Sequence, residues 1–421
     1  MRRSERKWIP VFVLAGTAGA LSVGLRPSSH PNLVVIVIDS LRADAISRST
    51  GAPHTPACDG LAREGQAFPA AFAHAPLTLP AHAALLSGRP PDESGVRVGG
   101  QAIERALPLL AEHLARRGYQ TGAAIGSATP WPPGSGPGIA RGFQVCAQGP
   151  GESTSGDEVT RDAARILDGF DPDEPFFLFA HYAQPPERHD ARDDAGRAGR
   201  GLLDDRPSAA GMRARYRLQV EAADRAVGAL LDELRRRDLY ENALIVLTGD
   251  HGEALGEHGH FGQAVSLYDE MLSVPLVVRL PLGRRTAELE EAACGLVRHI
   301  DVAPTILELL DVQALPGASG TSLLHPARRE LVAETHPPEA PRDLFALRDE
   351  RYKLIFDPST EAFEMYRLGP DPLELDDVFA HQGHLRDDWQ RRLRDLARRA
   401  GAVPAAPLEG QTTARRRVPG Q

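Results

Sequence analysis

Cysteine, lysine and surplus basic charge are all scarce in this chain of 421 residues. The three cysteines, Cys58, Cys146 and Cys294, are too few and too scattered for a disulfide framework or a CxxC metal site, and they allow one bridge at most. Lys7 and Lys353 are the only lysines, so arginine carries nearly all of the positive charge, which we interpret as a bias of the genome rather than a function. Asp and Glu outnumber Lys and Arg by 57 to 48, which leaves a formal charge of -9 and argues against nucleic acid as a partner.

The composition is that of a folded globular protein, with 42% hydrophobic and 25% charged residues. The length suits one large α/β domain or two domains of average size, with a core that needs no covalent staple. The sequence contains no internal repeat.

The N-terminal segment has the pattern of an export sequence. Four basic residues between Arg2 and Lys7 precede an apolar stretch from Trp8 to Leu25. Ala18-Gly19-Ala20 is a candidate cleavage site, while the stretch also approaches the length of a membrane-spanning helix. Residues 1–30 are therefore either a signal peptide or a membrane anchor. Both alternatives predict that the rest of the chain works outside the cytoplasm, in the periplasm or a similar compartment, soluble or associated with the membrane through this segment.

Short aliphatic runs predict a parallel sheet buried on both faces. The run Leu33–Ile38 is unbroken and rich in β-branched residues, and similar runs recur at 122–125, 176–180, 243–248 and 275–280. Segments with helical periodicity separate them, notably 107–117 and 216–237, which predicts a doubly wound α/β sheet. Residues 187–208 are rich in Asp, Arg and Gly and are predicted to form a mobile surface insertion.

Polar residues directly after two of these runs are the first candidates for chemistry. Asp39 follows the first strand, and Asp250-His251 follows the strand predicted at 243–248. Ligands collect at the carboxyl ends of parallel strands, so we expect these side chains to meet. A lone Asp after a strand is usually a helix cap. Two acids with an adjacent histidine suit a divalent ion such as Mn²⁺ or Zn²⁺ better than an all-oxygen calcium cage.

Thr78 is predicted at the start of a helix. Pro80 fits its first turn, the alanines and leucines that follow favour its continuation, and Gly88 can end it. Free backbone N–H groups at such a helix start are suited to bind phosphate or sulfate. The alternative is that Thr78 only caps the helix.

The segment from Pro31 to Asp44 resembles the opening metal-binding segment of the sulfatase family, which belongs to the alkaline phosphatase superfamily. The likeness continues in order through further segments: 55–56, 61–68, 78–88, 175–182, 248–259, 301–305, 347–355 and 365–372. It implies an alkaline-phosphatase-like α/β sandwich with a large mixed, mostly parallel sheet covered by helices, followed by a small C-terminal antiparallel α+β subdomain. We place the catalytic α/β domain at 31–325, the subdomain at 326–400 and a disordered tail at 401–421.

The sequence departs from the sulfatase pattern at the residues that carry the chemistry. Sulfatases have two adjacent Asp residues where this chain has Asp39-Ser40, and Asp-Asn where it has Asp250-His251. The family nucleophile is a Cys or Ser in Cys/Ser-x-Pro-x-Arg that becomes formylglycine. The matching residues are Thr78 and, in place of the arginine, His82, so no formylglycine is expected.

Gln263 stands where the family places a lysine that contacts sulfate. The resulting set instead resembles the one-metal site of phosphodiesterases and phosphoglycerol or phosphoethanolamine transferases of the superfamily, which use an unmodified threonine. Its members are Asp39, Thr78, Asp250 and His251.

This second resemblance implies a hydrolase or transferase that attacks a phosphate or sulfate ester with Thr78, held on a divalent metal. Mn, Zn or Mg is favoured and Ca stays open. We expect His82 to take part in catalysis and Arg42, His258 and His260 to bind the substrate. The substrate is expected to be a small-molecule, glycan or lipid ester. A true sulfatase and a degenerate, inactive binding protein are the alternatives. His74 and His181 are interpreted as structural histidines with satisfied ring nitrogens.

Overall fold

The computed structural model describes residues 30–46, 53–126, 138–148, 154–183, 209–282, 284, 286–337 and 342–402. The predicted export segment, the predicted insertion at 187–208 and nearly all of the predicted tail lie outside these residues. Within them, no helix combines the length and the apolar character needed to cross a membrane. The three cysteines are all free, so the single bridge that the sequence allowed does not form.

The main sheet has seven strands in the order β2-β11-β7-β1-β6-β4-β5. Five of them run parallel: β5 (Val145–Gln148), β4 (Gln120–Ile125), β6 (Phe176–Tyr182), β1 (Asn32–Ile38) and β7 (Ala243–Gly249). β11 (Leu276–Arg279) pairs antiparallel with β7, and β2 (Gln66–Ala67) pairs antiparallel with β11. Every residue of β1, β6 and β7 is buried, which is why their aliphatic runs are unbroken.

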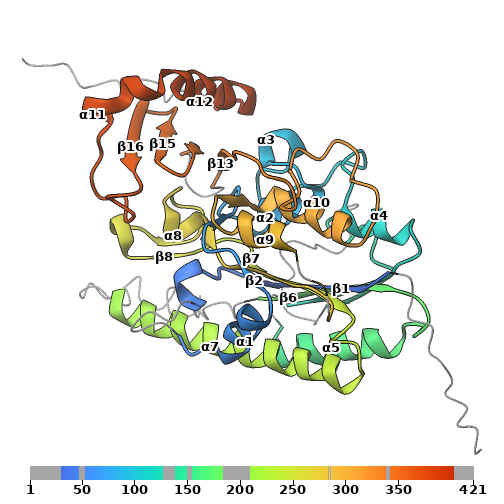
Figure 1. Ribbon diagram of the computed structural model, residues 1–421. Coiled ribbons are helices and arrows are strands. Elements are labelled where there is room, and N and C mark those ends of the chain that lie inside the picture. The colour runs from blue at the N-terminus through green and yellow to red at the C-terminus, as the bar shows by residue number, and fades with distance from the viewer. Residues whose placement is uncertain are drawn as a thin grey trace, which may run out of the picture.

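Helices cover both faces of this sheet (Figure 1). One face packs against α1 (Pro56–Glu64), α5 (Gly156–Asp168) and α7 (Ala209–Arg236). The other packs against α2 (Thr78–Ser87), α4 (Leu110–Ala115), α9 (Ala287–Ala292) and α10 (His299–Leu309). The even-numbered residues of β1 from 34 to 38 enter the first core and the odd-numbered residues from 33 to 37 enter the second. The mixed, mostly parallel, helix-covered sheet expected from the sequence is confirmed.

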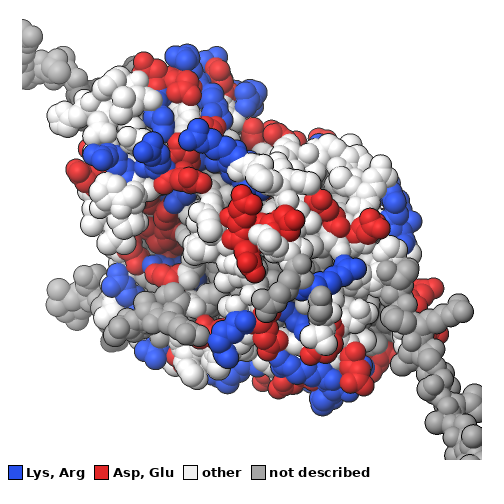
Figure 2. Space-filling model, viewed as in Figure 1, with Lys and Arg blue, Asp and Glu red and all other residues white. Residues whose placement is uncertain are grey.

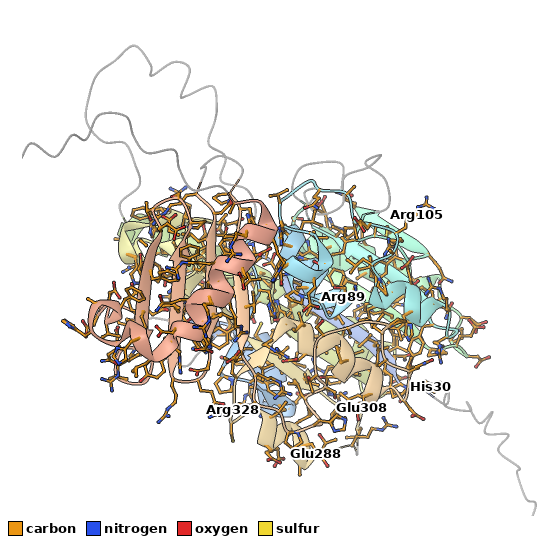
Figure 3. The ribbon with its side chains drawn as sticks, turned by 90° about the horizontal axis from the view of Figure 1, so that it is seen from above. His30, Arg89, Arg105, Glu288, Glu308 and Arg328 are labelled. Atoms are coloured by element: carbon orange, nitrogen blue, oxygen red, sulfur yellow. The ribbon has the colours of Figure 1, made fainter. Side chains whose placement is uncertain are left out.

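A four-stranded antiparallel sheet follows near the C-terminus. It contains β13 (Leu331–Thr335), β14 (Leu344–Arg348), β15 (Tyr352–Asp357) and β16 (Ala362–Arg367), and α11 (Phe379–Gln382) and α12 (Asp387–Ala400) pack on it. Seen from above, this subdomain stands beside the helix layer that contains Arg89, the residue after the C-cap of α2 (Figure 3). An antiparallel subdomain is therefore confirmed, while its boundary at 325 stays a prediction.

Short elements surround the carboxyl ends of the main strands. The second small sheet contains β3 (Ala71–Phe72), β10 (Ser273–Val274) and β12 (Val297–Arg298), and β8 (Ala254–Leu255) pairs with β9 (Phe261–Gly262). The described residues also form the short helices α3 (Pro91–Ser94) and α8 (Asp269–Leu272) and 3-10 turns at 43–46, 257–259 and 383–386. The loops between β1, α2, β6 and β7 thus converge on one edge of the sheet.

Candidate active site

The structure brings Asp39, Asp250 and His251 together at the carboxyl ends of β1 and β7. These neighbouring parallel strands end in register, with Ile38 opposite Gly249, so the residues that follow them are side by side. One ligand atom from each of the three lies within 4.8 Å of the others. Asp250 and His251 are fully buried, and Asp39 is 9% exposed. The strand-end pattern in the sequence was sufficient to place these three together.

Asp250 is a buried carboxylate that is only half satisfied. Its Oδ1 accepts hydrogen bonds from the backbone N–H of Ser40 at 2.9 Å and of His251 at 2.8 Å. Its Oδ2 accepts none from the described part of the chain. Burial raises the pKa of Asp250, and the charge of Asp39 raises it further, although His251 opposes both. An unpartnered buried oxygen facing a second carboxylate and an imidazole is the environment that a cation stabilises.

Ser40 occupies the position of the second sulfatase aspartate, and it links two departures from the family. Its hydroxyl donates to Oδ1 of Asp39 at 3.0 Å and accepts from Nε2 of Gln263 at 2.7 Å. The resemblance described above matches Gln263 to the family lysine and Ser40 to the second aspartate, and the structure shows these two neutral side chains hydrogen-bonded to each other. Ser40 also has a φ of 56°, in the left-handed region. The sequence showed both substitutions but not that the two side chains meet.

Thr78 is the first residue of α2, as predicted. Leu77 is the N-cap, and the helix ends at Gly88, whose φ of 68° closes a left-handed cap. The Oγ1 atom of Thr78 lies 3.4 Å from Nε2 of His251, and the Thr78 side chain is partly exposed. The hydroxyl therefore faces the carboxylate and imidazole cluster at the positive end of a helix dipole.

The orientation of His251 is fixed by its neighbour. Its Nδ1 lies 2.8 Å from the carbonyl oxygen of Gly252, which can only accept, so Nδ1 carries a proton and donates. The lone pair of Nε2 is then directed at Thr78 and the carboxylates. Burial alone would lower the pKa of His251, but Asp250 and Asp39 outweigh it and the pKa is raised.

His82, at the arginine position, contacts the backbone of Thr78 rather than its hydroxyl. Nδ1 of His82 donates to the Thr78 carbonyl oxygen at 2.7 Å. Burial lowers the pKa of His82 to about 4, so the ring is neutral at pH 7 and supplies no positive charge. The contact makes His82 a positioning residue for the first turn of α2.

His181 is the site residue that sequence reasoning missed. It is fully buried on β6, and neither ring nitrogen has a hydrogen-bond partner among the described residues, so its interpretation as a satisfied structural histidine is wrong. Its Nε2 lies 4.0 Å from Oδ2 of Asp39, and its ring meets that of His82 edge-on at 4.9 Å. The alternation of side chains along the strand could have indicated this, because residue 181 lies on the same side of the sheet as Phe179, which is the side covered by α2. His74 is only half satisfied, because its Nδ1 bonds the carbonyl oxygen of Val332 at 2.6 Å while its Nε2 has no partner among the described residues.

The residues expected to bind substrate lie beside the cluster rather than in it. Arg42 forms a two-point pair with Asp44 and a further ion pair with Glu257 at 3.1 Å. Both ring nitrogens of His258 are occupied, by Oε1 of Glu270 and by the carbonyl oxygen of residue 374, each at 3.0 Å. His260 stacks near Tyr268, with ring centres 6.3 Å apart.

Arg42 and His258 line a cavity of about 910 Å³ between α7, α8 and the loop at 372–375. Figure 2 shows a hollow with acidic side chains on this side of the molecule, next to the C-terminal subdomain. The cavity is large enough for the organic part of an ester. Arg42 and His258 contribute to its walls, but their charges are already engaged by neighbouring acids.

The donor set fits a divalent metal. Two carboxylates, one imidazole with a directed lone pair and one hydroxyl match the preferences of Mn²⁺, Zn²⁺ or Mg²⁺. The unpartnered Oδ2 of Asp250 is the structural observation that supports this fit.

Comparison with known proteins identifies the family. The Sulfatase family model matches residues 31–312, and the model for the N-sulphoglucosamine sulphohydrolase C-terminal region matches 256–399. The chain therefore belongs to the sulfatase family.

Curated relatives align over part of their length. An N-acetylglucosamine-6-O-sulfatase of Bacteroides thetaiotaomicron is 30% identical over 178 residues, which is 39% of this chain and 31% of that protein. The multifunctional alkaline phosphatase superfamily protein PehA of Trinickia caryophylli is 33% identical over 130 residues, 31% of this chain and 24% of that protein. The alignments thus span about a third of these relatives or less.

Solved structures match the whole fold. A protein whose structure was solved in complex with its substrate D-glucosamine-2-N,6-O-disulfate has a TM-score of 0.69 at 18% identity, covering 88% of this chain and 98% of that one. The phosphonate monoester hydrolase of Agrobacterium radiobacter has a TM-score of 0.65 at 20% identity, covering 89% and 96%. At these identities the likeness establishes the fold, and the fold class predicted from the sequence is confirmed.

Proposed function

We propose that this chain cleaves a phosphate or sulfate ester with Thr78 as nucleophile, at a divalent metal ion held by Asp39, Asp250, His251 and Thr78. The observation that carries the proposal is the 3.4 Å approach of the Thr78 hydroxyl to Nε2 of His251 within the carboxylate cluster. When bound, the ion lowers the pKa of a coordinated hydroxyl and neutralises developing negative charge.

The roles of the residues follow from their contacts. The lone pair of His251 and the two carboxylates face the hydroxyl of Thr78, and the start of α2 directs free N–H groups toward an incoming anion. Attack by the Thr78 oxygen on phosphorus or sulfur breaks the ester bond, releases the alcohol and leaves Thr78 esterified. Water or an acceptor alcohol then cleaves that ester and restores the hydroxyl. His82 keeps the first turn of α2 in place through the Thr78 carbonyl.

Phosphoester chemistry is the form we favour. The threonine is unmodified, and the arginine and lysine positions of the sulfatase pattern hold the neutral His82 and Gln263. Sulfuric ester hydrolysis is the second candidate, supported by relatives and neighbours that act on sulfated sugars by name. Those same names support a glycan ester as substrate.

Turnover of nitrophenyl sulfate, a nitrophenyl phosphate monoester and a bis-nitrophenyl phosphodiester by the purified protein tests this proposal. We expect a phosphate ester to be cleaved, with no turnover by Thr78→Ala. Sulfate-only turnover would favour the second candidate. Absence of turnover with every ester, together with absence of bound metal, would favour a binding protein without activity.

We also propose that the chain is exported, supported by the basic and then apolar pattern of residues 2–25. Fractionation of cells that carry a tagged full-length chain tests this. Tagged protein in the cytoplasmic fraction would contradict export. Tagged protein in the membrane fraction would indicate an uncleaved anchor, and tagged protein in the soluble exported fraction would indicate a cleaved signal peptide.

A further inference from the structure

A second group of metal-ligating side chains shares Asp250 with the site described above. One ligand atom each from His82, His181 and Asp250 lies within 4.8 Å of the others, and all three residues are fully buried. They come from α2, the end of β6 and the end of β7. We propose that these three side chains hold a second divalent transition-metal ion, of the zinc class, beside the ion proposed for Asp39, Asp250 and His251.

The main support is a set of buried atoms without partners. Both ring nitrogens of His181, Nε2 of His82 and Oδ2 of Asp250 make no hydrogen bond with any described group. Native proteins pair nearly all buried polar atoms, so four orphans from three adjacent side chains indicate a missing common partner. An apolar group in this space would leave all four nitrogen and oxygen atoms without a partner. A cation bound by the two rings and the carboxylate would satisfy at least one atom of each side chain.

The protonation of His82 suits a ligand. Its Nδ1 donates to the Thr78 carbonyl oxygen at 2.7 Å, so Nε2 keeps its lone pair. Metal-bound histidines commonly donate the other ring N–H to a carbonyl or carboxylate in this way. Two imidazoles with one carboxylate favour zinc-class ions over calcium or magnesium, which prefer oxygen.

Asp250 provides the reason for two ions rather than one. Its Oδ1 is held by two backbone donors, while its free Oδ2 lies 3.5 Å from Nε2 of His251 and 3.7 Å from Nδ1 of His82. The free oxygen thus lies close to both rings, with the protonated Nδ1 as the nearer nitrogen of His82, and a carboxylate shared by two ions needs such proximity to both ligands.

Metal content measures the proposal directly. The full-length protein is saturated with zinc sulfate, desalted and analysed by inductively coupled plasma mass spectrometry. We expect about two zinc ions per chain in the wild type and about one in His181→Asn. His251→Gln is expected to lose the other ion, and Asp250→Asn both. His113→Asn, which alters a buried histidine bonded to the carbonyl oxygen of Gln313, is the matched control and should keep two.

Circular dichroism in EDTA establishes that each variant folds, and His82→Gln replaces His181→Asn if the latter does not. If the wild type binds one ion and His181→Asn still binds it, the proposal is overturned. It is also overturned if the wild type binds one ion that both His181→Asn and His251→Gln lose, because that result indicates one shared centre. One ion lost only in His181→Asn would support the second site while contradicting the metal site of the proposed function.

Discussion

Lys353, one of two lysines in the chain, is fully buried in β15 between two acids. Its Nζ lies 2.9 Å from Oδ1 of Asp269 and 2.8 Å from Oε1 of Glu374, which is 1% exposed. Oε2 of Glu374 accepts from the backbone N–H of Asp269 at 2.6 Å. This cluster joins the C-terminal sheet to α8, beside the cavity. Replacing the cation alone therefore leaves buried negative charge at that junction.

We expect Lys353→Met to lower the free energy of unfolding by about 3–5 kcal/mol at pH 8, the range found when one partner of a buried ion pair is removed. Burial already raises the pKa of Glu374 while Lys353 lowers it, so removal of Lys353 raises it further. The folded variant then holds a proton that the unfolded chain releases, and its stability falls as pH rises. The defect should therefore be smaller at pH 6 than at pH 8.

Urea unfolding followed by circular dichroism at both pH values measures this. The double variant Lys353→Met/Glu374→Gln should recover most of the loss, because it removes the charge that was left behind. Arg394→Met, which breaks an exposed pair with Glu361, is the control and should cost less than about 1 kcal/mol. The reasoning would be refuted if the free energy of unfolding of Lys353→Met lay within about 1 kcal/mol of the wild type at pH 8, or if the loss of stability were the same at both pH values.

Three further predictions follow from the site and its surroundings. Thr78→Ala should reduce turnover on the order of a thousand-fold or more with the fold intact, since it removes the nucleophile, and a loss below tenfold in steady-state kinetics would contradict this. Gly252→Ala should weaken metal binding measured by calorimetry, because a Cβ there would come within 2.0 Å of the carbonyl oxygen of Glu270 and displace the loop after His251; unchanged affinity would count against that loop's role. Burial lowers the pKa of His74 and His299 to about 3, so below pH 6.5 these two histidines become protonated in the unfolded chain but stay neutral in the folded chain. Stability to urea should fall by about 2 kcal/mol per histidine between pH 7 and pH 5, and His74→Asn should fall less steeply; equal slopes would contradict the assignment.

The sequence predicted those features that depend on local pattern. The buried aliphatic runs located the parallel strands, and the position of residues 39 and 250 after two of them was enough to place both acids at one edge. Pro80 and Gly88 located α2 and hence Thr78 at its start. These inferences needed only strand direction and helix capping.

Features that depend on pairing between distant segments were not predicted. The Ser40–Gln263 hydrogen bond joins residues 223 positions apart. His181 became a site residue through its packing beneath His82, and Lys353 through the two acids around it. Composition had explained the rarity of lysine, but it gave no indication that one lysine was buried. These contacts between distant residues, and the cavity that Arg42 and His258 line, produce no repeating pattern in the sequence from which they could be predicted.

The central claim is that Thr78 and the strand-end residues hold the same metal ion. A crystal structure of the protein loaded with Mn²⁺ or Zn²⁺, with an anomalous difference map at the absorption edge of that metal, tests it most directly. We predict a peak in contact with the Thr78 hydroxyl, with Asp39 and Asp250 and with Nε2 of His251. The absence of a peak at these atoms, or a Thr78 hydroxyl turned away from the ion, would contradict it.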